Sequence, residues 1–155
     1  LALACQPSLL IADEPTTALD VSTQLQILQL LYKLRQDQAI GILLISHDFS
    51  VIGSMCDRVY VMYAGMVVES APKEIILSQP RHPYTEALLE ALPEKAIARK
   101  VRLKALEGNV PSLYELPKGC RFASRCPRAY EQCYQASPPQ ILIGSKHEVA
   151  CWLLA

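Results

Sequence analysis

Two adjacent carboxylates, Asp13 and Glu14, are the first residues of this sequence whose types and position could do chemistry. They directly follow the apolar residues 8–12 and precede Pro15. A carboxylate at the end of a buried strand can hold Mg²⁺, which prefers oxygen ligands, and a neighbouring carboxylate can act on water as a general base. Taken alone, the dipeptide is explained equally well by two acids that stabilise the first turn of a following helix.

Four cysteines near the C-terminus form a second group with the spacing C-x5-C-x6-C-x17-C: Cys120, Cys126, Cys133 and Cys151. Four soft ligands in a short, loop-rich segment with little apolar core predict a metal or cluster that holds the segment together. Disulfides are disfavoured because nothing in the sequence marks export to an oxidising compartment. Zinc and a [4Fe-4S] cluster both remain open, although the close C-x2-C pairs common in structural zinc sites are missing.

The neighbours of these cysteines allow two interpretations. Cations interleaved with the cysteines could balance the negative charge of a thiolate-bound cluster or could simply face water: Lys118, Arg121, Arg125 and Arg128. His147 could replace a cysteine in a zinc site, but a surface position is the simpler interpretation. The two remaining cysteines, Cys5 and Cys56, are interpreted as small buried core residues.

An α/β framework is predicted to position the carboxylates. Apolar runs predict strands, buried on both faces of a parallel sheet, at 8–13, 40–46 and 58–63, and apolar periodicity predicts helices at 21–36 and 48–55. This βαβαβ order predicts parallel pairing. After a tight turn at Ala64-Gly65, an antiparallel edge strand is expected at 66–69, followed by helices at 73–78 and 84–92.

His47 follows the second predicted strand, and functional side chains of parallel sheets gather where the strands end. This position favours a functional role for His47 over that of a capped surface residue. Thr16 and Thr17 are expected to cap the helix that follows them. His82, between Arg81 and Pro83, is interpreted as a turn residue.

Several motifs in order carry a resemblance to a known family. Residues 13–20 (DEPTTALD) followed by residues 43–48 (LLISHD) resemble the second half of the ATP-binding subunits of ABC transporters. Residues 61–65 (VMYAG), 81–85 (RHPYT) and 119–122 (GCRF) look like the dipeptide and oligopeptide permease branch of that family. The resemblance covers essentially the whole chain.

The resemblance implies a role for each site residue. Asp13 would help to hold the Mg²⁺ of bound ATP, Glu14 would polarise the attacking water, and His47 would contact the γ-phosphate. Asp20 lies in a loop, 18–20, that matches the one crossing to the partner subunit. The permease branch also carries a [4Fe-4S] cluster at a matching cysteine set, which favours the cluster over zinc.

The implied fold is part of a P-loop NTPase (RecA-like) parallel sheet with helices, followed by a small irregular cysteine-rich module. We place the boundary near Pro93, giving an ATPase part at 1–92 and a cysteine-rich module at 93–155. The sequence contains neither a G-x-x-x-x-G-K-[ST] phosphate loop nor the glutamine loop or signature motif. Residues 1–5 look like the end of a helix, so we expect the chain to be a fragment. Because it lacks the phosphate loop, we expect this fragment alone neither to bind ATP tightly nor to hydrolyse it.

The partners implied are a second ATPase subunit, two membrane permeases and, indirectly, an extracytoplasmic peptide-binding protein. The expected location is the cytoplasmic face of the inner membrane, held peripherally, because no apolar run is long enough to span a bilayer. The resemblance implies a dipeptide or oligopeptide as the transported substrate, and the sequence does not separate these from nickel complexes or antimicrobial peptides.

Composition limits the alternatives. With 51% hydrophobic residues the chain can bury a core, and its 15 basic and 15 acidic residues cancel, so no nucleic-acid partner is expected. The charges are unevenly distributed along the chain: residues 1–92 carry ten acidic and five basic side chains, and residues 93–155 carry five acidic and ten basic ones. Two alternatives therefore stay open: a non-transport ABC ATPase with a basic, metal-stapled nucleic-acid module, and a metal-stapled interaction module without ATP chemistry.

Overall fold

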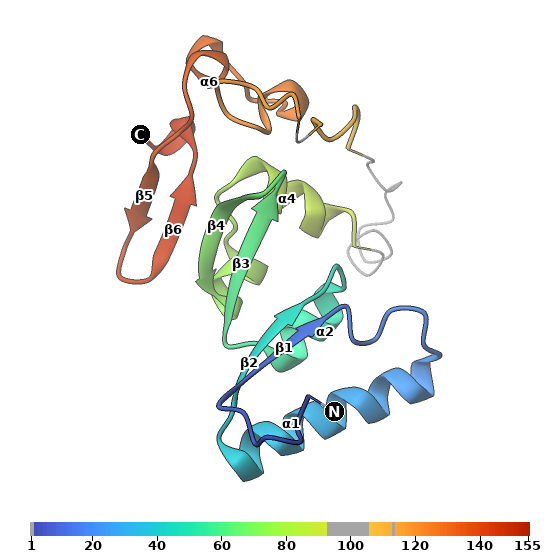
Figure 1. The fold of residues 1–155 in the computed structure, drawn as a ribbon. Helices are drawn as coiled ribbons and strands as arrows, with labels where there is room; N and C mark the ends of the chain where they lie inside the picture. Colours follow the sequence, from blue (N-terminus) through green and yellow to red (C-terminus); the bar gives the residue numbers. More distant parts are fainter. Residues whose placement is uncertain (1, 93–105, 113) are drawn as a thin grey trace. The chain divides into compact units, whose positions relative to one another are not determined.

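The computed structural model describes residues 2–92, 106–112 and 114–155, which form two compact units, Leu1–Asp57 and Arg58–Ala155 (Figure 1). The boundary expected near Pro93 and the basic residues from 95 to 104 lie outside the described residues. The division into 1–92 and 93–155 therefore stays a prediction. Each unit is described by itself.

The first unit contains a two-stranded parallel sheet and two helices. Strands β1 (Leu9–Asp13) and β2 (Gly41–Ile45) pair in register from Leu9 opposite Gly41 to Asp13 opposite Ile45. Helix α1 (Val21–Gln38) connects them, and α2 (Phe49–Met55) follows β2. The predicted β-α-β-α order of this unit is confirmed, with boundaries shifted by up to two residues.

One prediction about these strands is wrong. Both were expected to be buried on both faces, but alternate side chains of the strands are 46–61% exposed: Leu9, Ile11, Leu43 and Ile45. A period-two exposure pattern arises when only one face of a sheet is covered. Residues 2–5 form a turn rather than a helix end, which leaves Cys5 exposed instead of in a core.

The second unit is built on a four-stranded antiparallel sheet in the order β3-β4-β6-β5. Its strands are β3 (Arg58–Tyr63), β4 (Met66–Pro72), β5 (Gln140–Ile143) and β6 (His147–Ala150). The β5–β6 hairpin had no counterpart among the predicted strands. Its pairing with β4 brings the C-terminal residues beside a strand almost eighty positions earlier (Figure 1).

The expectation that β3 is a third parallel strand is wrong. It pairs antiparallel with β4 through the predicted turn at Ala64 and Gly65, whose φ values are 46° and 81°. Two positive φ angles in a two-residue loop match the twist of a β-hairpin, so β3 pairs with β4, the next strand in the sequence. The predicted antiparallel strand after the turn is confirmed and extends to Pro72.

Short helices complete the second unit. Helix α3 (Lys73–Ser78) has the predicted bounds, and α4 (Pro83–Glu90) begins with its proline at the first position, where no backbone N–H is needed. The cysteine-rich region adds η1 (Ala123–Arg125), α6 (Glu131–Gln135) and η2 (Trp152–Leu154). No helix among the described residues has the length and apolar character needed to cross a membrane.

Candidate functional site

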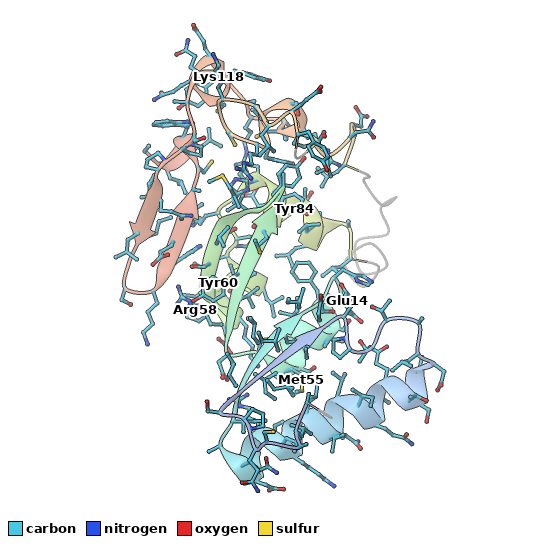
Figure 2. The ribbon with its side chains drawn as sticks, in the orientation of Figure 1. Glu14, Met55, Arg58, Tyr60, Tyr84 and Lys118 are labelled. Atoms are coloured by element: carbon cyan, nitrogen blue, oxygen red, sulfur yellow. The ribbon has the colours of Figure 1, made fainter. Side chains whose placement is uncertain are left out.

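The ends of β1 and β2 bring Glu14 and His47 together. Glu14 follows the last residue of β1 (Figure 2), and its N–H donates to the carbonyl of Ile45 at the end of β2 at 2.9 Å. This bond extends the parallel pairing by one residue. The two oxygens of the Glu14 carboxylate lie 2.9 and 3.0 Å from Nδ1 of His47.

The electrostatics of this pair keep Glu14 ionised. The Thr17 hydroxyl donates to its carboxylate at 2.6 Å, and this bond, followed by the bond with His47, lowers the pKa of Glu14. In return the hydrogen bond and charge of Glu14 raise the pKa of His47. Both side chains remain accessible to solvent, at 36% and 77%. An ionised, accessible carboxylate can accept a proton from a water molecule.

Asp13 and Asp20 occupy different local positions. Asp13 is the last residue of β1 and is exposed. Asp20 caps α1: its side chain accepts from the backbone N–H groups of Ser22 and Thr23 at 3.0 Å each and from the Thr23 hydroxyl at 2.6 Å. None of these contacts links Asp20 to Glu14 or His47.

The expectation that Thr16 or Thr17 caps α1 is therefore wrong. Asp20 immediately precedes the first helical residue, so its carboxylate reaches the free amides of the first turn, as caps do. Thr17, three residues earlier, instead donates to Glu14. Sequence reasoning missed this contact, although the i, i+3 spacing of the two residues within a tight loop allows it.

In the second unit the four C-terminal cysteines line one small cavity, together with His82 and Arg128. All four are free thiols: Cys120, Cys126, Cys133 and Cys151. Burial raises the pKa of the thiols of Cys120, Cys126 and Cys151. Segments far apart in the sequence thus contribute soft ligands to the same place.

The backbone around Gly119 draws two of these cysteines together. The N–H of Cys120 donates to the carbonyl of Cys133 at 2.7 Å. A Cβ on Gly119 would lie 2.2 Å from that same carbonyl oxygen, so the backbone segments at Gly119 and Cys133 are too close for any side chain at position 119. Glycine is therefore required at this position.

Within the described part of the chain, no three His, Cys, Asp or Glu side chains come close enough to hold a single metal ion. A single Zn²⁺ draws its thiolates into a tight tetrahedron, with Zn–S of about 2.3 Å. Each cysteine of a [4Fe-4S] cluster, in contrast, binds a different iron at the corner of a larger group. Four thiols around one cavity are the type of ligand that both groups use, and the arrangement of the described residues does not choose between them.

A buried carboxylate connects the cavity to the sheet. Glu69 of β4 is fully buried and accepts from the backbone N–H groups of Arg81 and His82 at 2.7 and 3.1 Å. Its Oε1 also lies 2.7 Å from Nε2 of His147 on β6. One side chain thus joins the turn that carries His82 to the strand that leads into Cys151.

The structure corrects the expectation for His147. It was interpreted as a surface residue, but it is 5% exposed and hydrogen-bonded to Glu69. The cause is the pairing of β6 with β4, which the residues near His147 in the sequence do not predict. His82 is at a turn, as expected, and caps α4 by accepting from the N–H of Tyr84, yet it is also 1% exposed, and burial lowers its pKa to about 4.

The arginines between the cysteines do not simply face water. Arg125 donates to the carbonyls of Leu106 and Glu107, and Arg128 forms an ion pair with Glu86 of α4. Arg121 donates to the carbonyl of Ala64 in the β3–β4 turn. These contacts hold the cysteine-rich loops against the rest of the second unit.

Comparison with known proteins identifies the family. Residues 68–133 match the family described as "Oligopeptide/dipeptide transporter, C-terminal region". The chain is 48% identical over 151 residues to the dipeptide transport ATP-binding protein DppD of Haemophilus influenzae, covering 97% of this chain and 45% of that protein. It is 47% identical over 154 residues to the oligopeptide transport ATP-binding protein AppD of Bacillus subtilis, covering 99% and 46%.

Over nearly its whole length the chain is therefore similar to peptide-transport ATP-binding proteins, and residues 68–133 belong to the C-terminal region of that family. A further relative, the probable D,D-dipeptide transport ATP-binding protein DdpD of Escherichia coli, is 46% identical over 152 residues, which are 98% of this chain and 46% of that protein. The chain spans about half the length of the curated relatives it matches. The matched family segment begins in β4 and ends at Cys133, so it includes the turn at His82 and three of the four cavity cysteines.

Proposed function

We propose that this chain is part of an ATP-hydrolysing subunit that energises the import of dipeptides or oligopeptides. The observation that carries this proposal is the contact between Glu14 and His47 at the carboxyl ends of two parallel strands. Ligand sites of open α/β sheets lie at such ends. The names of the relatives support the substrate class, and nothing in the comparisons supports a nucleic-acid-binding or purely structural alternative.

Each residue has a distinct part in the proposed reaction. Asp13 helps to hold Mg²⁺ of the bound nucleotide, and Glu14 accepts the proton of the attacking water. His47 orients Glu14 through Nδ1 and can contact the γ-phosphate through its other nitrogen. Asp20 holds the start of α1 and with it the loop proposed to face a partner subunit.

Phosphoryl transfer depends on positioning and charge neutralisation. The sequence contains no phosphate loop, so these 155 residues alone are proposed to bind ATP weakly and not to hydrolyse it. Titration calorimetry tests this: heat from tight binding would contradict it.

The catalytic assignment is tested in the complete ATP-binding protein that carries this segment. Glu14→Gln keeps the size of the side chain but cannot accept the proton, so ATP turnover should be lost while ATP binding is kept. Asp37→Asn is the matched control, because it makes the same change at an exposed residue near the end of α1. Normal turnover in Glu14→Gln would remove Glu14 from the role of base.

We further propose that Cys120, Cys126, Cys133 and Cys151 hold a [4Fe-4S] cluster. The support is their position around one cavity, which Arg128 also lines. When bound, the cluster supplies a structural link between loops that have little apolar core, and its charge favours nearby cations. The four cysteines would supply the thiol ligands. The segments that carry them are also joined by the close backbone contact at Gly119 and by the hydrogen bonds of Glu69.

The cluster is tested by iron and acid-labile sulfide analysis on anaerobically purified protein. Cys126→Ser should lose iron, sulfide and visible absorption, and Cys5→Ser, at an exposed cysteine of the first unit, should keep all three. Iron and sulfide unchanged in Cys126→Ser would contradict the assignment, and zinc without sulfide would replace the cluster by a zinc site.

The proposed assembly contains a second ATP-binding subunit, two permeases in the membrane and an extracytoplasmic binding protein that delivers peptide. The proposed location is the cytoplasmic face of the inner membrane. The support is that the relatives are named as transport ATP-binding proteins. Co-purification of the complete protein with permease subunits in detergent tests it, and a monomer free of them would oppose it.

A further inference from the structure

Thr17 is bonded to Glu14 twice, through its side chain and through its backbone. Its hydroxyl donates to Oε2 of the Glu14 carboxylate at 2.6 Å. Its backbone N–H donates to the carbonyl of Glu14 at 3.1 Å. The loop that follows β1 is thus closed onto the residue that we propose as the base.

The backbone of Glu14 needs such support. Its φ is 48°, in the left-handed region that residues other than glycine rarely adopt. Such a conformation persists only where the surrounding contacts hold it. Here the N–H of Glu14 donates to the carbonyl of Ile45 at 2.9 Å, and its own carbonyl accepts from Thr17. Thr17 therefore supplies one of the contacts that keep Glu14 in this conformation.

The side-chain contacts are distributed unequally over the two carboxylate oxygens. Oε2 lies 2.6 Å from the Thr17 hydroxyl and 3.0 Å from Nδ1 of His47. Oε1 lies 2.9 Å from the same nitrogen of His47 and has no other hydrogen bond to the described residues. Because each carboxylate oxygen has about two lone pairs, Oε1 keeps one for a water molecule.

We propose that Thr17 is a positioning residue for ATP hydrolysis: its hydroxyl fixes the Glu14 carboxylate so that Oε1 faces the attacking water. The inference rests on the proposed function and adds a residue that acts only through Glu14. His47 lies at nearly equal distances from both oxygens, so it does not by itself choose between them. A base must point at the proton that it accepts, and a misplacement of about 1 Å can cost about a hundredfold in rate.

Two substitutions separate the hydroxyl of Thr17 from the rest of the side chain. Thr17→Val has nearly the same shape but no donor, and Thr17→Ser keeps the donor without the methyl group. Thr85→Val is the matched control, because it makes the same change in α4 at a hydroxyl that has no hydrogen-bond partner among the described residues. Thr17 is exposed, so neither of its substitutions should shift the thermal unfolding midpoint much.

The experiment measures kcat and the KM for ATP in the complete ATP-binding protein that carries this segment, with thermal unfolding on the same samples. Thr17→Val should lower kcat by about tenfold to a hundredfold and leave KM unchanged, because the orientation of the base matters only in the transition state. Thr17→Ser and Thr85→Val should keep kcat close to that of the unchanged protein.

The outcomes distinguish this role from the proposed function. If Glu14→Gln hydrolyses ATP normally, the proposed base fails and the role of Thr17 fails with it. If Glu14→Gln is inactive and Thr17→Val keeps its kcat, the base stands and the positioning role is refuted. A raised KM with unchanged kcat in Thr17→Val, or an equal loss of kcat in Thr17→Ser or Thr85→Val, would also refute it, because the hydroxyl would then not act through Glu14.

Discussion

Glu69→Ala should strongly destabilise the second unit, because it removes the carboxylate that takes part in three hydrogen bonds. The carboxylate is fully buried and receives two backbone N–H groups, from Arg81 and His82, and lies 2.7 Å from Nε2 of His147. Each orphaned buried donor costs about 1–3 kcal/mol. Three orphaned donors together cost at least about 3 kcal/mol, and we expect a loss of about 4 kcal/mol.

Urea unfolding followed by tryptophan fluorescence measures this loss. Trp152 is the single tryptophan, follows Cys151 directly and donates from its indole N–H to the carbonyl of Ala136 at 2.9 Å. With an m value of about 2 kcal/mol/M, a loss of about 4 kcal/mol lowers the urea midpoint by about 2 M. All variants are compared at the same iron content.

Glu148→Ala is the matched control. It removes the same side chain from β6, next to His147, but Glu148 is exposed and should change stability by no more than about 0.5 kcal/mol. If Glu69→Ala lowers the midpoint by less than about 0.5 M, or no more than the control does, the buried carboxylate does not hold the unit together and the reasoning fails.

The remaining predictions concern three separate positions. Proton NMR titration should show that the pKa of His47 is above 6.5 and that it falls in Glu14→Gln. Because the pKa of Glu14 is lowered and that of His47 is raised, the contribution of the pair to stability is complete between pH 4.5 and 6.5. It is lost as pH rises through the pKa of His47 or falls through the pKa of Glu14. An unshifted His47 in the unchanged protein would contradict the contact. Gly119→Ala should cost about 1–3 kcal/mol in urea unfolding, because its Cβ meets the carbonyl of Cys133; a neutral effect would show that the backbone there can move. Asp20→Ala should cost about 0.5–2 kcal/mol by circular dichroism and Asp20→Asn much less, whereas equal losses would argue against a cap.

Local signals in the sequence predicted local structure well. Pro83 is the first residue of α4, the helix expected at 48–55 is present as α2, and the Ala64-Gly65 turn forms a hairpin. Each of these depends on residues within a few positions of one another. The parallel pairing of β1 and β2 brings Glu14 and His47 together, because a parallel pair of strands fixes which ends are neighbours.

Pairing between distant segments could not be predicted in the same way. The run at 58–63 is apolar enough for either a parallel core strand or a hairpin strand, and only its partner decides between them. The burial of Glu69 and His147 depends on the β4–β6 pairing, across 78 positions. A lone acidic residue in a strand gives no sign that a histidine so far along the chain will cover it.

Two glutamate–histidine pairs among the described residues have almost the same separation but differ in exposure. Glu14 lies 2.9 Å from His47, and Glu69 lies 2.7 Å from His147. The first pair has side chains 36% and 77% exposed, so water screens it and it adds little to stability, but it can reach a substrate. The second pair has side chains 0% and 7% exposed, so it can reach no substrate and its removal leaves orphaned donors. Burial therefore distinguishes the pair proposed for chemistry from the pair that stabilises the fold. ATP turnover should depend on Glu14 and His47, and stability should depend on Glu69 and His147.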